Sequence, residues 1–68
     1  MAIVEIDYTN WKGERRVRQI FPRALFLGKT PYHPKFQWML SAEDVETNTV
    51  KEFAMEGIHS WTQIEKTN

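Results

Sequence analysis

The apolar and polar residues of the chain alternate with the period of two that is typical of half-buried β-strands. The clearest example lies at residues 2–9, where Val4, Ile6 and Tyr8 alternate with polar side chains. The same pattern predicts strands at residues 15–20, 24–27, 37–42 and 50–55, and a last short strand or turn at 57–64. We therefore expect an all-β protein.

Turn-forming residues separate these segments. Asn10 and Gly13 predict a hairpin loop at residues 10–14, and Pro22 predicts a bend or bulge within the second strand. Pro31 and Pro34 interrupt a long loop at residues 28–36, and residues 44–48 are typical of a turn. Residues 41–44 resemble a helix start, but too few residues follow for a stable helix, so a strand running into a hairpin is expected.

These elements predict a small, strongly bent antiparallel sheet, and an SH3- or Sm-like barrel of four to five strands is the simplest architecture. Closure of the barrel would remove exposed strand edges. The chain of 68 residues is expected to form one domain over residues 1–64, with a polar tail at 65–68. Any edge strand left open would favour a homodimer.

The composition of the chain limits which kinds of interaction can stabilise the fold. The chain has no cysteine, which excludes disulfides and thiolate metal sites and fits a reducing, cytoplasmic environment. Its two histidines, His33 and His59, are too few for an ordinary structural zinc site, and neither a metal nor another cofactor is expected. No apolar run approaches the roughly 20 residues of a membrane span, and the start of the chain does not resemble a signal peptide.

The charges are distributed unevenly although they sum to zero. Residues 10–35 carry seven basic and one acidic residue, whereas residues 41–56 carry five acidic and one basic residue. One interpretation is an anionic ligand on the basic side. The other, slightly favoured, is that basic and acidic strands pair with each other within the sheet.

Three cations fall on the apolar side of their predicted strands. Alternation places Arg16 and Arg18 on the same side as Ile20, and Lys51 on the same side as Phe53. Such cations cost free energy unless they reach water or an anion. They either extend to solvent at one end of the barrel, or Arg18 and Lys51 flank a pocket for an anionic ligand.

Several ordered segments resemble the core of a WYL domain. They are Ile6-Asp7-Tyr8, Trp-Lys-Gly-Glu at residues 11–14, Arg-Gln-Ile-Phe-Pro at 18–22, Gln-Trp-Met-Leu at 37–40, and residues 50–58. The segment at residues 30–38 is similar to one in short stand-alone WYL-like proteins of bacteria and phages. Met39 replaces the Tyr of the name-giving motif, Lys51 replaces an Arg, and Gly57 stands at a second basic position.

This resemblance implies an Sm-like β-barrel that senses a ligand, since WYL domains are thought to bind nucleotides or nucleic acid. They usually occur in transcription regulators and defence-associated proteins. The winged helix of such regulators is missing from this chain. Lysine in place of arginine at position 51 exchanges a bidentate fork for a point charge.

The residues favour binding over catalysis, because neither a nucleophile motif nor a glycine-rich phosphate loop is found. We expect a non-catalytic module that binds a phosphate-bearing ligand in a regulatory or defence-related context. The candidate ligand-binding residues are Tyr8, Trp11, Arg16, Arg18, His33, Gln37 and Lys51. The alternative is a small phage or bacterial module that binds protein, and inhibits or decoys a host defence factor or its nucleotide signal.

The aromatic residues of the long loop and its flanks leave a related choice open. Four of these aromatics, Tyr8, Trp11, Tyr32 and Trp38, could stack a base, but we expect Trp38 to lie in the core. Residues 32–34 are expected to fold back as a lid over the barrel. On this hypothesis, Gln37 or His33 hydrogen-bonds the loop backbone.

Overall fold

The computed structural model describes residues 2–65 as five antiparallel strands in a single sheet, with one short 3-10 helix. The order of the strands across the sheet is β4-β3-β2-β1-β5. This arrangement confirms the predicted all-β fold and its small, bent antiparallel sheet. The elements are β1 (Ile3–Thr9), β2 (Arg15–Gly28), β3 (Gln37–Asp44), β4 (Thr49–Ala54), the 3-10 helix η1 (Met55–Gly57) and β5 (Ile58–Glu65).

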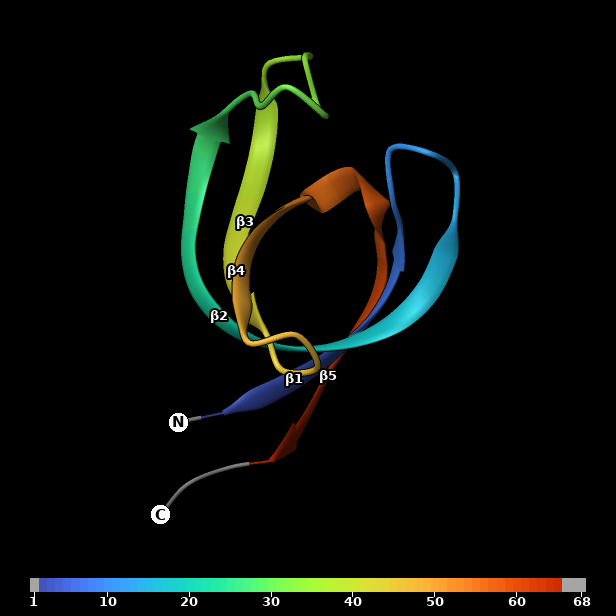
Figure 1. Cartoon of the computed structure of the whole chain (residues 1–68), viewed down its shortest axis with the longest axis vertical. Coiled ribbons are helices and arrows are strands. Elements are labelled where there is room, and N and C mark those ends of the chain that lie inside the picture. Colours follow the sequence, from blue (N-terminus) through green and yellow to red (C-terminus); the bar gives the residue numbers. More distant parts are fainter. Residues whose placement is uncertain (1, 66–68) are drawn as a thin grey trace.

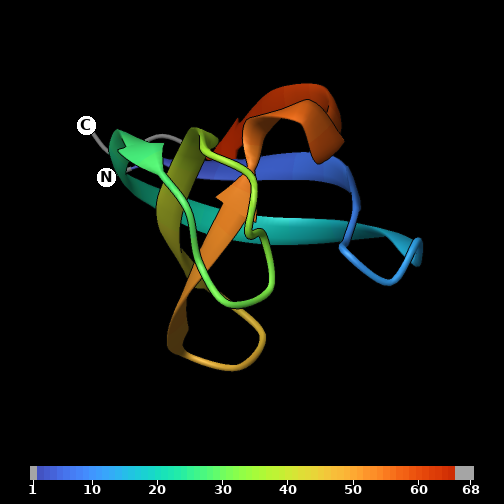
Figure 2. The same cartoon turned by 90° about the horizontal axis from the view of Figure 1, so that it is seen from above.

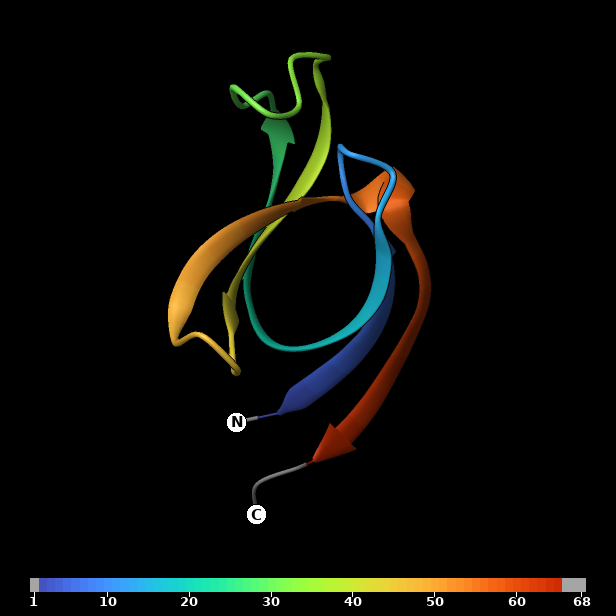
Figure 3. The same cartoon turned by 45° about the vertical axis from the view of Figure 1, so that its right-hand side comes forward.

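The sheet curls on itself without closing into a complete barrel (Figure 1). Its two edge strands, β4 and β5, are connected by η1, and the distance between the two strands increases away from this connection (Figure 3). In Figure 2, β1 and β2 lie side by side as a long ribbon, and β3 and β4 run across it. The barrel-like curvature expected from the sequence is therefore present, but open strand edges remain.

The long strand β2 produces much of this curvature. Its residues up to Ile20 pair with β1, and those from Ile20 to Gly28 pair with β3. The register with β3 shifts between Pro22 and Ala24. Proline cannot donate a ladder hydrogen bond, which explains why the strand is irregular at this point. The two predicted segments at residues 15–20 and 24–27 are thus halves of one bent strand.

The core lies inside the curled sheet, as the alternation predicts. Val4, Ile6 and Tyr8 are all buried on the inner side of β1. The edge of the Tyr8 ring packs against Phe53, with ring centroids 5.0 Å apart. Burial of these apolar groups is the main stabilising contribution in a chain without disulfides or other cross-links. The remaining members of this core are Ile20, Leu40, Ala42 and Phe53, with Met55 and Ile58 packed against it.

The prediction that Trp38 belongs to the core is wrong, because Trp38 is 54% exposed. Trp38 pairs with Leu27 at the end of the β2–β3 hairpin, whereas Leu40, two residues further along β3, is buried. Both β3 side chains project on the same side of the strand. The hairpin extends beyond the core at this point, so an inward orientation does not bury Trp38.

The remaining boundaries differ from prediction by a few residues. Strand β3 continues to Asp44, and the turn then occupies residues 45–48, with Asn48 at a positive φ of 56°. Residues 41–44 are strand and not the start of a helix, although Asp44 was expected in the turn, and β5 is a full strand of eight residues. Of the predicted polar tail, Glu65 ends β5 and residues 66–68 lie outside the described part of the chain. Between residues 2 and 65, no helix has the length and apolar character needed to cross a membrane.

Candidate functional site

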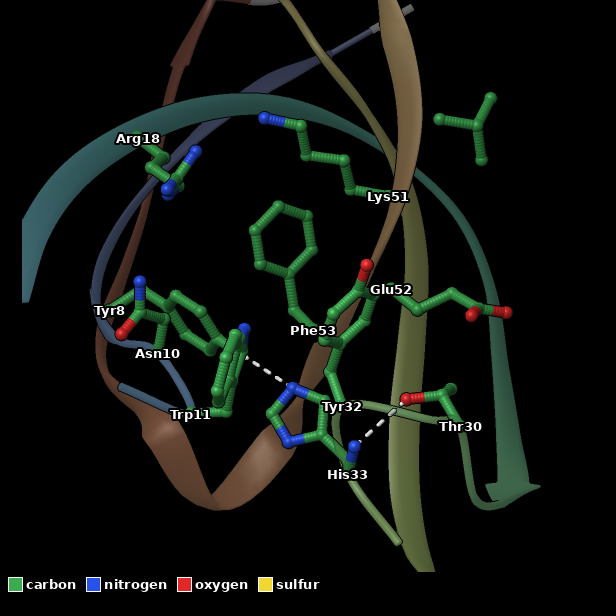
Figure 4. A pocket seen from close by; sticks show the side chains of 11 residues that line it. Tyr8, Asn10, Trp11, Arg18, Thr30, Tyr32, His33, Lys51, Glu52 and Phe53 are labelled. Carbon is green, nitrogen blue, oxygen red and sulfur yellow. Dashed lines mark hydrogen bonds between the residues drawn. The ribbon is translucent and has the colours of Figure 1, made fainter. Parts of the chain in front are cut away.

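A pocket of about 520 Å³ lies where three segments of the curled sheet come together (Figure 4). The β1–β2 hairpin supplies one wall, the β2–β3 loop the second, and β4 the third. Arg18 of β2 lies at one end. The lining residues are Tyr8, Asn10, Trp11, Arg18, Thr30, Tyr32, His33, Val50, Lys51, Glu52 and Phe53.

The hairpin wall is held in shape by Asn10. Its side-chain oxygen accepts the backbone N–H groups of Lys12 and Glu14, both at 2.9 Å. Gly13 adopts a positive φ of 84°, which glycine tolerates without strain. This tightly bonded loop presents Trp11, which remains more than half exposed, at the mouth of the pocket.

The second wall is the loop between β2 and β3. The backbone N–H groups of Thr30 and His33 each donate to the other residue's carbonyl, and His33 N–H also reaches the Thr30 hydroxyl. Gln37 donates its side-chain N–H to the carbonyl of Lys35 at 3.1 Å. These bonds confirm the prediction that Gln37 or His33 ties down the loop backbone.

The loop also contacts the hairpin opposite. The Tyr32 ring stacks on Trp11, with centroids 5.4 Å apart and planes inclined by 29°. Tyr32 and Phe36 nevertheless remain largely exposed, so the loop does not cover the core as the expected lid. Instead it forms a wall of an open pocket.

Tyr8 connects the core to the pocket. Its hydroxyl accepts the backbone N–H of Ala54 at 3.1 Å and lies 3.5 Å from Nε2 of His33. Burial raises the pKa of Tyr8 above its usual 10.0, against the opposing effects of the Ala54 N–H and the charge of Arg18. The hydroxyl therefore stays protonated near neutral pH and can donate to His33.

The charged end of the pocket is built around a buried carboxylate, Asp44. Arg18 donates from Nη1 to Oδ2 at 3.0 Å, and Lys51 Nζ lies 3.5 Å from the same oxygen. The Asp44 side chain is only 3% exposed and that of Arg18 14%. In Figure 4, Lys51 extends toward Arg18, whereas the Glu52 carboxylate points away from both cations.

Asp44 remains ionised in this environment. Burial by itself would raise its pKa, but the backbone N–H of Glu46, the charge of Lys51 and the hydrogen bond from Arg18 outweigh burial and lower it below 3.8. The other carboxylate oxygen, Oδ1, accepts the Glu46 N–H at 2.9 Å. The carboxylate thus fixes both cations and the turn that follows β3.

The structure brings together five of the seven predicted ligand-binding residues. They are Tyr8, Trp11, Arg18, His33 and Lys51. Arg16 and Gln37 do not line this pocket. Arg16 pairs with Glu46 on the exposed surface at 2.7 Å, and Gln37 bonds within its own loop.

The interpretation that basic and acidic strands pair with each other also holds for several residues. The Arg15 guanidinium donates two hydrogen bonds to the Asp7 carboxylate across the β1–β2 pair, from Nε to Oδ1 at 2.9 Å and from Nη2 to Oδ2 at 2.8 Å. Arg23 lies 3.9 Å from Glu43 on the neighbouring β3. The uneven charge along the chain is therefore largely compensated between strands.

The candidate ligand-binding residues did not include several that build the pocket. Tyr32 was expected in the lid and as one of the aromatics that could stack a base, Phe53 was assigned to a strand face, and Asp44, which pairs with Arg18 and Lys51, was assigned to a turn. Asp44 carried a usable signal, because it continues the alternation of Leu40 and Ala42 along β3. Its side chain therefore points to the inner face, where a carboxylate requires cationic partners.

Gly57, the position where the resembled family carries a second basic residue, has no room for a side chain. A Cβ atom there would lie 2.5 Å from the carbonyl oxygen of Thr9 and 2.9 Å from the Tyr8 ring. The site thus relies on Arg18 and Lys51. Within residues 2–65, no three His, Cys, Asp or Glu side chains cluster in a way that could hold a metal ion.

Comparison with known proteins adds no family assignment. No protein-family model matches the chain, and no curated protein matches it significantly in sequence. The geometry of the pocket is therefore the main basis for considering its function.

Proposed function

We propose that this protein is a non-catalytic binding module whose pocket takes a phosphate-bearing ligand, either a nucleotide or a segment of nucleic acid. The observation that carries the proposal is the arrangement of the pocket. Two cations, Arg18 and Lys51, lie at one end, and the stacked pair of Trp11 and Tyr32 lies at the other (Figure 4). A phosphate and an attached base require these two environments.

The cationic end suits a single phosphate. Arg18 and Lys51 carry two positive charges, and Asp44 removes one, leaving a net charge of +1 at this end. The Nε atom of Arg18 is buried and has no partner among the described residues. Lys51 is more exposed than Arg18, so it can turn toward a ligand without uncovering the core. A monophosphate or phosphodiester matches this charge better than a triphosphate.

The aromatic end suits a planar base. Trp11 and Tyr32 are both more than half exposed, and stacking of one base on such rings contributes roughly 1–3 kcal/mol. Phe53 and Tyr8 form the apolar part of the pocket between the two ends (Figure 4). Stacking depends little on the identity of the base, so we expect weak sequence preference.

The biological setting of this proposal comes from the sequence. The resemblance to WYL domains favours a regulatory or defence-related context, and the lack of cysteine favours the cytoplasm. Absence of catalysis is proposed because the pocket's one histidine, His33, contacts the Tyr8 hydroxyl and has no carboxylate partner among the described hydrogen bonds. A general base would need an orienting group in that position.

The test is titration of the protein with adenosine, adenosine monophosphate, adenosine triphosphate and a short oligothymidine, followed by tryptophan fluorescence. We expect the monophosphate to bind more tightly than adenosine, and its affinity to fall as salt rises. Arg18→Ala should weaken binding roughly ten- to a hundredfold, the effect of losing a charge-assisted hydrogen bond. Lys51→Gln should also weaken it, and it leaves the buried Arg18–Asp44 pair intact.

Arg23→Ala is the matched control, because Arg23 lies on the exposed surface away from the pocket. The affinity of Arg23→Ala for each of these ligands should equal that of the wild type. If neither nucleotide nor the oligonucleotide binds the wild type at millimolar concentration, the pocket proposal fails. The alternative of a protein-interaction module would then be preferred.

A further inference from the structure

The second half of β2 has a free backbone edge. Strand β1 pairs with β2 only up to Ile20, whereas β3 pairs with it as far as Gly28. On the side away from β3, residues 21–28 have no strand partner within the described chain. Figure 1 shows this half of β2 on the outside of the molecule. Its outward N–H and C=O groups are therefore available to another strand.

Apolar side chains accompany this edge. Leu25 and Leu27 are 56% and 49% exposed. They lie opposite Leu40 and Trp38 of β3, and so project on the same side of the sheet as these residues. Since Leu40 is part of the core, the apolar side of the sheet continues from the core outward to an edge that nothing in the described chain covers.

The outer edges of β4 and β5, the two edge strands of the sheet, are less suited to pairing with a strand. On β4, the Ala54 N–H is already bonded to the Tyr8 hydroxyl, and the pocket opens beside this strand. Strand β5 shows two register irregularities in its pairing with β1, and such irregularities discourage further strands. The pairing of β2 with β3 is regular from Ala24 to Gly28.

We propose that a second copy of the chain pairs with this edge, antiparallel to it, about a two-fold axis at Leu25, so that the two copies of Leu25 lie opposite each other. The two sheets then form one continuous sheet across the dimer, and Leu25 and Leu27 of both copies are buried together. A two-fold interface brings like surfaces together, so a charged edge would repel itself. Arg23 is the one charged residue in the segment 21–28, and it lies beside Glu43.

The experiment measures the mass of the wild-type protein in solution by light scattering and sedimentation from micromolar to millimolar concentration. We expect the mass to rise from that of the 8.1 kDa monomer to twice this value. The double variant Leu25→Lys/Leu27→Lys should remain a monomer at every concentration. Ile64→Lys is the control, since Ile64 is similarly exposed but lies on β5, and it should dimerise like the wild type.

Hydrogen exchange of the wild type provides a test that needs no substitution. Amides of residues 24–28 that point away from β3 should become more protected as concentration rises, whereas those of β5 should not. A monomer mass throughout the range would overturn the proposal. A folded double variant that still dimerises, or an Ile64→Lys variant that does not, would also overturn it. Nucleotide binding by the double variant should equal that of the wild type, because neither leucine lines the pocket.

Discussion

Arg16 and Arg18 are two residues apart on the same side of β2, yet they occupy different environments. The Arg16 side chain is 53% exposed and pairs with Glu46, which is 70% exposed. The Arg18 side chain is 14% exposed and pairs with Asp44, which is 3% exposed. Both pairs have short nitrogen–oxygen distances, 2.7 and 3.0 Å, so distance alone does not distinguish them.

The difference between these pairs lies in what happens when one partner is removed. Water can solvate Arg16 if Glu46 is lost, and exposed pairs contribute little to stability. Arg18 is surrounded by the core and the pocket, with its guanidinium 6.0 Å from the Phe53 ring. Loss of Asp44 would leave that charge poorly solvated. The depth of the partner, more than the contact distance, therefore decides what an ion pair contributes.

Asp44→Asn should destabilise the protein more than any other single substitution in these two ion pairs. The substitution keeps the size of the side chain but removes the charge that compensates Arg18 and Lys51. We expect a loss of about 3 kcal/mol in the free energy of unfolding, which is typical when one member of a buried pair is removed. Urea denaturation measures this loss. The matched variant Glu46→Gln should lose less than about 1 kcal/mol, and equal losses for both variants would contradict the comparison.

Lowering the pH should also show how much the ionised Asp44 carboxylate contributes to stability. Because the folded protein lowers the pKa of Asp44 below 3.8, its ionised form contributes stability above that value. This contribution should disappear as the pH falls through the lowered pKa. Urea denaturation between pH 7 and strongly acidic pH should show the wild type losing more stability than Asp44→Asn.

Asp7 must be controlled in that experiment, because the hydrogen bonds from Arg15 lower its pKa as well. Its carboxylate lies on the exposed surface, where solvent screens the charge. The comparison is therefore repeated in an Asp7→Asn background. If Asp7→Asn and the double variant Asp7→Asn/Asp44→Asn lose the same stability as the pH falls, Asp44 is not responsible for the acid sensitivity.

The sequence was sufficient to predict which side chains face inward, but not how deeply each is buried. Alternation placed Val4, Ile6 and Tyr8 in the core, and it placed Arg18 and Lys51 on the inner side of their strands. Pro22 predicted the irregularity of β2, because proline has no backbone N–H to donate to a neighbouring strand. These properties depend on neighbours in the chain and are therefore visible locally.

The errors concern contacts between residues far apart in the chain. Trp38 faces the same way as Leu40 but lies past the end of the core, which depends on where the curled sheet stops. Asp44 meets Arg18 only because β2 and β3 pair and bend together, across 26 positions of sequence. Curvature and strand register determine such contacts, and alternation contains no information about either.

The two histidines differ in the same way as the two arginines, with smaller consequences for stability. His33 lines the pocket and lies 3.5 Å from the part-buried Tyr8 hydroxyl, whereas His59 contacts Thr9 Oγ1 at 2.7 Å in an exposed position. His33→Ala leaves the tyrosine hydroxyl without that partner and loosens the wall that holds Tyr32 against Trp11. We expect a loss of about 1 kcal/mol, or a Tm lower by roughly 4–8 °C for a domain of this size.

His59→Ala should change the free energy of unfolding by no more than about 0.5 kcal/mol, because water replaces its exposed hydrogen bond. Thermal unfolding followed by circular dichroism measures both variants under one set of conditions. A shorter contact is thus expected to contribute less than a longer one, since the longer contact involves a buried group. If His59→Ala lowers Tm more than His33→Ala does, contact distance outweighs burial at this end of β1. The wall formed by the β2–β3 loop would then be independent of the Tyr8–His33 contact.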